Sequence, residues 1–98
     1  MAFIDDYEFS ILKNEAENLV IEELELQLKA IKGTICRCET CVLDMATMAL
    51  NAVRPLYHVS LLGNQYASQA MSEMSYAASL KKSVSTAIEK VRKNPAHD

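Results

Sequence analysis

Residues 36–60 read CRCETCVLDMATMALNAVRPLYHVS, and they contain a cysteine cluster, a helical pattern and a proline-tyrosine turn in succession. Within this stretch, CVLDMATMALNAV is apolar almost all round, which is typical of a buried helix. We expect the helix to begin at Cys38 or Thr40 and to end before Pro55, because proline cannot continue its hydrogen bonding. The stretch therefore predicts an all-α fold: a small helical domain with a short extended segment.

The few polar residues of this helix follow one stripe. They are spaced at i, i+3, i+7 and i+10, and they are Asp44, Thr47, Asn51 and Arg54. Residues at this spacing share one face of a helix. Two interpretations stay open: the stripe is the only solvated face of the helix, or it lines a polar groove or interface.

All three cysteines of the chain, Cys36, Cys38 and Cys41, fall within six positions. Cys38 and Cys41 are three positions apart and face one side of a helix's first turn, and Cys36 precedes them in a loop. Three thiolates so arranged suit zinc, which is tetrahedral and binds sulfur. Two alternatives remain. The cysteines could be buried and reduced without a metal, or Cys38 and Cys41 could be a redox pair, although the usual βαβ pattern is absent.

Zinc needs a fourth ligand, and the candidates are His97, Asp44, His58 and water. We predict His97, because three cysteines and one histidine form a common structural set and the end of the chain can fold back. A carboxylate is a harder ligand than a thiolate-rich site prefers, and water would leave an open position. The predicted structural zinc site, which staples the domain, consists of Cys36, Cys38, Cys41 and His97.

A first helix is expected before the cysteines, beginning at Asp5 or Asp6 and ending at Gly33. The letters DDYE supply a carboxylate N-cap and a capping box, and glycine commonly follows a helix end. Ile21 and Leu26 lie off the main apolar stripe of this segment, so the helix is apolar on more than one side.

The segment after the buried helix, RPLYHVSLLG, has the apolar–polar alternation of a strand at Tyr57, Val59 and Leu61. One strand cannot satisfy its own backbone hydrogen bonds, and the sequence contains no clear second strand. Two solutions stay open: pairing with the same segment of a second chain, or an irregular loop.

A helical pattern without Gly or Pro then runs from residue 65 to Pro95. One continuous helix of about 28 residues would be ~42 Å long, whereas a compact domain of this size has a radius of gyration of about 13 Å. The helix therefore overhangs the domain or breaks, and SLKKSVS (79–85) is the expected break. An overhanging apolar stripe needs a partner, and we predict a homodimer.

The composition of the 98 residues fits one domain, residues 1–98, with a net charge of −3. The first 30 residues contain eight acids and two bases, and Lys81 to Asp98 contain five bases and two acids. This is not the basic balance of a DNA-binding protein, so no direct DNA binding is expected. No apolar run reaches the ~18 residues of a membrane span, and the acidic start is unlike a secretory signal. We expect no membrane insertion and a cytoplasmic location.

The stretch CRCETCVLDMATMALNAVRPLYHVS strongly resembles the signature of the late competence development protein family, ComFB, and the end AIEKVRKNPAHD resembles that family's closing stretch. One departure is Val53-Arg54-Pro55, where leucine-proline-proline is often seen. The resemblance implies an α-helical homodimer encoded with DNA-uptake genes, a metal at Cys36, Cys38 and Cys41, and no established enzymatic activity. Some ComFB-like proteins are receptors for cyclic di-nucleotides, chiefly cyclic di-GMP.

Two hypotheses of function follow. The first is a non-enzymatic regulatory receptor, in which a two-fold dimer binds cyclic di-GMP or a related cyclic di-nucleotide through arginine, carboxylate and amide groups that match guanine and phosphate. The residues expected to bind it are Arg37, Asp44, Asn51, Arg54 and Tyr57. The alternative is a structural adaptor of the competence DNA-uptake machinery, with the acid-rich first helix as its contact and no nucleotide ligand. Zinc-dependent hydrolysis ranks below both, because it needs an open metal position and a general base.

Overall fold

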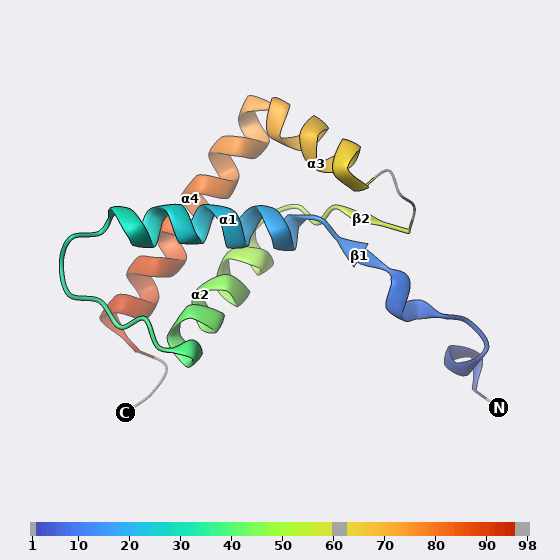
Figure 1. The fold of residues 1–98 in the computed structure, drawn as a ribbon, viewed down its shortest axis with the longest axis horizontal. Coiled ribbons are helices and arrows are strands. Elements are labelled where there is room, and N and C mark those ends of the chain that lie inside the picture. The colour runs from blue at the N-terminus through green and yellow to red at the C-terminus, as the bar shows by residue number, and fades with distance from the viewer. Residues whose placement is uncertain (1, 60–62, 96–98) are drawn as a thin grey trace.

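A computed structural model describes residues 2–59 and 63–95 of the protein, and Figure 1 shows the arrangement of its helices and strands. The elements are α1 (Ala16–Ala30), α2 (Glu39–Ala52), α3 (Gly63–Ser72) and α4 (Met74–Lys93), with the strands β1 (Lys13–Asn14) and β2 (Tyr57–His58). The described chain is mostly helical, as the sequence predicts, and its strands form one minimal antiparallel pair.

Helix α4 packs against both α1 and α2, and the three helices share one hydrophobic core. Buried positions recur every three or four residues on each helix, as a single apolar face requires. They include Val20, Leu24 and Leu28 on α1, Cys41, Met45 and Ala49 on α2, and Leu80, Val84, Ile88 and Val91 on α4. This packing fixes α2, and with it the cysteines at its start and Arg54 beyond its end.

The start of α1 differs from the prediction. The helix begins at Ala16, and residues 2–12, which we call the N-terminal arm, contain two 3-10 turns with every side chain exposed. The capping pattern at Asp5 therefore begins no α-helix, because the arm has no core to pack against. The helix begins instead where burial begins: Ala16 is fully buried, and its N–H donates to Asn14 Oδ1 at 3.1 Å.

The end of α1 also differs from the prediction. The helix stops at Ala30, and Ile31 is already extended, so Gly33 is not the residue that ends it. The guanidinium of Arg37 donates to the carbonyl oxygen of Leu28 at 2.7 Å and to that of Ile31 at 3.4 Å. A side chain from the cysteine loop thus adds donors at the helix end, where the Leu28 carbonyl also accepts the N–H of Ile31 at 3.3 Å.

The extended segment after α2 finds its partner within the chain, which neither sequence-based alternative foresaw. β2 pairs antiparallel with β1, with Lys13 opposite His58 and Asn14 opposite Tyr57. Asn14 Oδ1 also accepts the N–H of Leu56 at 2.7 Å, and the N–H of Glu15 donates to the Leu56 carbonyl at 3.0 Å. Residues 60–62 of this segment lie outside the described residues.

The long C-terminal helical pattern does break, but at Glu73 and not within residues 79–85, which are continuous in α4. Glu73 is extended, and α3 folds back at an angle to α4 (Figure 1). Three residues later, the hydroxyl of Tyr76 donates to the Arg54 carbonyl at 2.9 Å and holds α4 against the end of α2. The break thus lies three residues before a contact between segments that are 22 positions apart, which local sequence patterns do not show.

The molecule measures 49 × 36 × 17 Å along its principal axes. The outer faces of α1 and α2 carry exposed apolar side chains, among them Ile21, Leu26 and Leu43. None of the helices in the described part of the chain has the combination of length and apolar character needed to cross a membrane.

Candidate functional site

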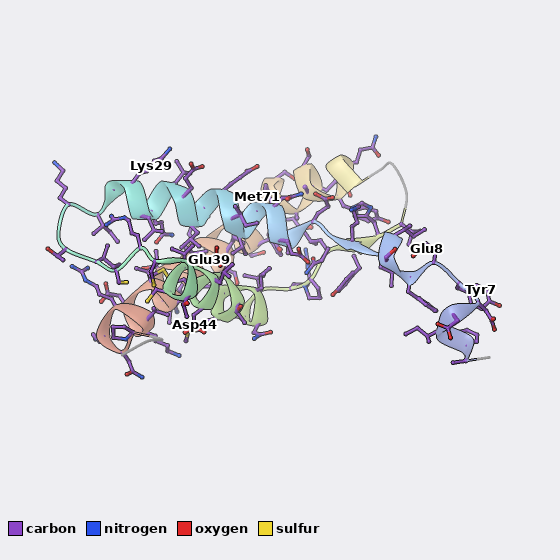
Figure 2. All side chains as sticks on the ribbon, turned by 60° about the horizontal axis from the view of Figure 1, so that its bottom comes forward. Tyr7, Glu8, Lys29, Glu39, Asp44 and Met71 are labelled. Carbon is purple, nitrogen blue, oxygen red and sulfur yellow. The ribbon has the colours of Figure 1, made fainter. Side chains whose placement is uncertain are left out.

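The cysteine cluster forms at the start of α2. Cys38 is the N-cap residue of the helix, Cys41 lies on its first turn, and Cys36 precedes both in the loop. Their three Sγ atoms lie within 4.8 Å of one another. Figure 2 shows sulfur atoms gathered beside Glu39, the first residue of α2. The predicted convergence of the three thiols is therefore confirmed.

This donor set fits a metal that prefers sulfur. Zinc–sulfur bonds of about 2.3 Å in a tetrahedron separate the sulfurs by about 3.8 Å, so small side-chain rotations would close the cluster around an ion. The N–H of Cys41 donates to Cys38 Sγ at 3.4 Å, so this sulfur lies at the amino end of α2. Cys41 is buried and Cys38 is exposed, so one side of the cluster stays open to further ligands.

The predicted fourth ligand, His97, lies outside the described residues. A cavity of about 130 Å³ adjoins Cys36 and Cys41, and Pro95 forms part of its wall. The described chain thus ends beside the cysteines. Of the other candidates, Asp44 is half-buried and shares a pocket with Lys90 and Lys93.

The five residues expected to bind a nucleotide divide into two places. Arg37 precedes α2 and is engaged with carbonyls at the end of α1, and Asp44 lies on the second turn of α2 beside α4. Asn51, Arg54 and Tyr57 lie around the end of α2, and all three are exposed. The 14-residue helix between these places is about 21 Å long. One guanine base therefore cannot contact both arginines within one protomer.

Arg54 is held in place at the end of α2. Its Nη2 lies 3.3 Å from Glu73 Oε2, and its guanidinium carbon lies 5.1 Å from the centre of the Tyr76 ring. The Tyr76 side chain is buried, and this burial raises the pKa of the phenol above its usual 10.0 although Arg54 opposes the shift. The Arg54 side chain itself remains 59 % exposed. Arg54 is thus an oriented, accessible guanidinium, and Asn51 and Tyr57, three residues before and after it in the sequence, are also exposed.

Comparison with known families agrees with the motif. The family described as late competence development protein ComFB matches residues 13–95, which is most of the chain. The chain belongs to the ComFB family. Among curated proteins, none matches the chain. The ComFB match includes all three cysteines and the whole of α2, whereas the N-terminal arm precedes it.

The polar stripe of α2 does not line a single groove in this ComFB-family chain. Asp44 lies beside α4, whereas Thr47 lies beside α1 and donates to the Leu43 carbonyl at 2.8 Å. The stripe thus spans two edges of the exposed face of α2. This arrangement fully matches neither the only solvated face of the helix nor the lining of one polar groove, which were the two interpretations from the sequence.

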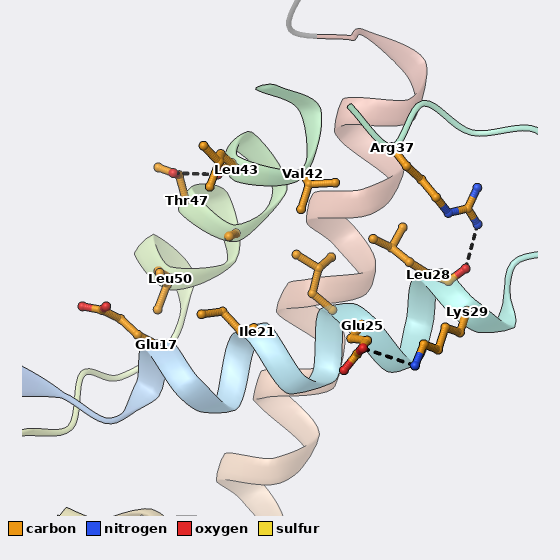
Figure 3. A pocket seen from close by; sticks show the side chains of 12 residues that line it. Glu17, Ile21, Glu25, Leu28, Lys29, Arg37, Val42, Leu43, Thr47 and Leu50 are labelled. Atoms are coloured by element: carbon orange, nitrogen blue, oxygen red, sulfur yellow. Dashed lines mark hydrogen bonds and ion pairs between the residues drawn. The ribbon is translucent and has the colours of Figure 1, made fainter. Parts of the chain in front are cut away.

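Sequence reasoning missed an apolar groove of about 850 Å³ between α1 and α2. Figure 3 shows Ile21 of α1 facing Leu50 of α2 across it, with Glu17 at one end and Arg37 at the other. Ile21 is 56 % exposed. The position of Ile21 off the main apolar stripe of α1 was the sequence signal for this groove. The sequence did not show which element this second apolar side of α1 would face.

A histidine–carboxylate pair was also missed. His58 Nε2 lies 2.8 Å from Glu15 Oε1, with both side chains largely buried, and the His58 ring stacks on Tyr66 with 6.0 Å between ring centres. The hydrogen bond with His58, followed by one from Asn18, lowers the pKa of Glu15 below its usual 4.5. His58 therefore joins the strand pair to α1, at the opposite end of α2 from the cysteines.

Proposed function

We propose that this ComFB-family protein is a non-enzymatic regulatory receptor that acts as a zinc-stabilised homodimer and binds cyclic di-GMP or a related cyclic di-nucleotide. The observation that carries the proposal is the oriented and exposed guanidinium of Arg54, with exposed Asn51 and Tyr57 three residues to either side in the sequence. Arginine pairs with the O6/N7 edge of guanine or with phosphate, an amide can pair with a base edge, and a phenol ring can stack on a base.

The metal in this proposal has a structural role. Zinc at Cys36, Cys38 and Cys41 would join the loop after α1 to the first turn of α2, and it would supply cross-linking and no reaction step. His97 is the proposed fourth ligand. It lies two residues beyond Pro95, a span of at most about 7 Å, and Pro95 already borders the cavity beside Cys36.

The homodimer in this proposal is supported by exposed apolar side chains and by the symmetry of the ligand. Apolar side chains of α1 and α2 are exposed, and a second copy would cover them. Cyclic di-GMP has two equivalent halves, so a two-fold dimer can present the same group to each half.

Calorimetric titration of the zinc-loaded protein with cyclic di-GMP tests this function. We expect saturable binding with one or two ligands per dimer, and a loss of roughly ten-fold or more in affinity for Arg54→Ala. Glu73→Gln removes the carboxylate that competes for Arg54, so its affinity should equal or exceed that of the wild type by up to about five-fold. Lys32→Ala, which removes one exposed positive charge elsewhere, is the matched control. Wild-type affinity in Arg54→Ala would exclude this binding site.

A second candidate function is a structural adaptor of the competence DNA-uptake machinery. The specific observation in its favour is the outer face of α1, where Leu26 is 64 % exposed between Glu22, Glu25 and Lys29. Exposed leucine within a charged rim is typical of a protein contact. Two results together would favour the adaptor function over the receptor function. Calorimetry would detect no binding of any cyclic di-nucleotide, and Leu26→Arg would abolish the binding of a purified competence protein.

A further inference from the structure

We propose that the N-terminal arm of one protomer, residues 2–12, occupies the α1/α2 groove of a second copy of the chain, which returns the same contact with its own arm. The proposal rests on the homodimer in the proposed function and assigns its interface. It also goes beyond the family, because the arm precedes the residues that match ComFB.

The arm is a preformed apolar surface. Its exposed apolar side chains, each at least 42 % exposed, are Phe3, Ile4, Tyr7, Phe9, Ile11 and Leu12. Its three aromatic rings pack on one another, with ring centres 4.9 to 6.1 Å apart. Large apolar clusters on a surface mark contact sites, and a cluster that is already ordered loses less entropy on binding.

The groove has the matching character. It holds about 850 Å³, which is within the range of pockets that enclose whole ligands. Its walls are mainly apolar, and Ile21 and Leu43, which lie on opposite walls, are each more than half exposed. A few aromatic side chains fit this volume.

The charges of the two surfaces are complementary at one end of the groove. The arm contains Asp5, Asp6 and Glu8 and no basic residue. Lys29 lies at this end but pairs with Glu25 at 3.2 Å, and Glu17 lies at the other end, so Arg37 is the charge that the arm would meet. Within the described residues, Arg37 donates to backbone carbonyls and contacts no carboxylate, so it can accept an acidic partner.

The geometry favours a second copy over the protomer's own arm. Figure 2 shows Tyr7 and Glu8 at the opposite end of the molecule from Lys29. The pairing of β1 with β2 holds the base of the arm and directs it away from the basic end of its own groove. To reach this end of its own groove, the arm would have to turn back along the molecule. An arm that enters from another protomer does not have to turn back.

The exposed surface is large enough for this interface. The chain exposes 7060 Å², whereas a compact folded monomer of 10.9 kDa exposes about 5,600 Å². The excess of about 1,500 Å² per chain exceeds the roughly 800 Å² that each partner buries in a standard interface. Two arms in two grooves would cover this excess symmetrically.

Light scattering after gel filtration, at a series of concentrations, tests the proposal on the full-length protein. The arm variant carries Phe3→Ser, Tyr7→Ser and Phe9→Ser, and the groove variant carries Leu43→Arg. The control, Leu26→Arg, adds the same charge at an equally exposed position outside the groove. We expect a dimer for the wild type and the control, and a rise of roughly ten-fold or more in the dissociation constant for each of the other two variants.

An equimolar mixture of the arm and groove variants provides the decisive measurement. A mixed dimer keeps one intact arm and one intact groove in contact, so the mixture should dimerise more tightly than either variant alone. If the arm variant dimerises like the wild type, the homodimer stands and the arm is not its interface. If the mixture gains nothing, the arm fills its own groove and the proposal fails. A wild-type monomer at all concentrations overturns both the homodimer and the arm exchange.

Discussion

The side-chain oxygen of Asn14 accepts the backbone N–H of Leu56 at 2.7 Å, across 42 positions of sequence. The same oxygen accepts the N–H of Ala16, so one half-buried amide both starts α1 and fixes the segment after α2. Replacement with alanine leaves both N–H groups without this acceptor. We expect Asn14→Ala to lower the free energy of unfolding by about 1–3 kcal/mol in urea titrations.

The matched control for this prediction is Asn14→Asp, which keeps the accepting oxygen and should remain within about 0.5 kcal/mol of the wild type. Equal stability of Asn14→Ala and the wild type would show that water replaces the side chain without cost.

Arg37 is predicted to act on stability and not on nucleotide binding. Its guanidinium bonds two carbonyls at the end of α1, so Arg37→Ala should destabilise the fold by about 1 kcal/mol, and Arg37→Lys should recover only part of this loss because lysine lacks the planar fork. Affinity for cyclic di-GMP, measured where the variant is fully folded, should stay near that of the wild type. A large loss of affinity without loss of stability would return Arg37 to the binding site.

Zinc binding should depend on His97 and not on His58. We expect His97→Gln to weaken zinc binding by at least about ten-fold in competition with a colorimetric chelator, because it removes one of four proposed ligands. His58→Gln is the matched control, since His58 pairs with Glu15 and should leave zinc affinity unchanged. Cobalt substitution should give the charge-transfer absorption of thiolate ligands, and Cys38→Ser should weaken it. Unchanged affinity in His97→Gln would leave water or Asp44 as the fourth ligand.

The pair of Glu15 and His58 predicts a pH dependence of stability. The folded pKa of Glu15 lies below its usual 4.5, so the stabilising contribution is fully present above about pH 4.5 and is lost as the pH falls through the folded value. Glu15→Gln should therefore be less stable than the wild type at pH 5.5, and the difference should narrow towards pH 3. Urea titrations at several pH values measure it. A difference independent of pH would assign the effect of Glu15 to packing.

The sequence predicted α2 and the cysteine cluster well because their signals are local. Cys38 caps the helix, and the chain leaves it just before Pro55, so both ends can be identified from neighbouring residues. The start of α1 could not be predicted in this way. The letters DDYE satisfy the local rule for a helix start, but only residues from Ala16 onward meet a core.

Two further features depend on contacts between distant segments. β1 has only two residues, Lys13 and Asn14, neither of which favours a strand, and they pair only because β2 lies beside them. The break at Glu73 lies close to the contact between Tyr76 and Arg54, which are 22 positions apart. The large separation of Arg37 from Arg54 could be predicted from the sequence, because it depends only on the length of α2. The hydrogen bond between Arg37 and the end of α1 could be seen only in the structure.

The place of α4 in the core has a consequence for synthesis of the protein. Leu80, Val84, Ile88 and Val91 come from the last fifth of the chain, and they cover the apolar faces of α1 and α2. While the ribosome still holds this segment, α1 and α2 have no third wall and remain marginal, as short helices without packing partners are. The three-helix core therefore forms only after α4 has left the ribosome, and the early segments depend until then on chaperones or on one another for protection from aggregation.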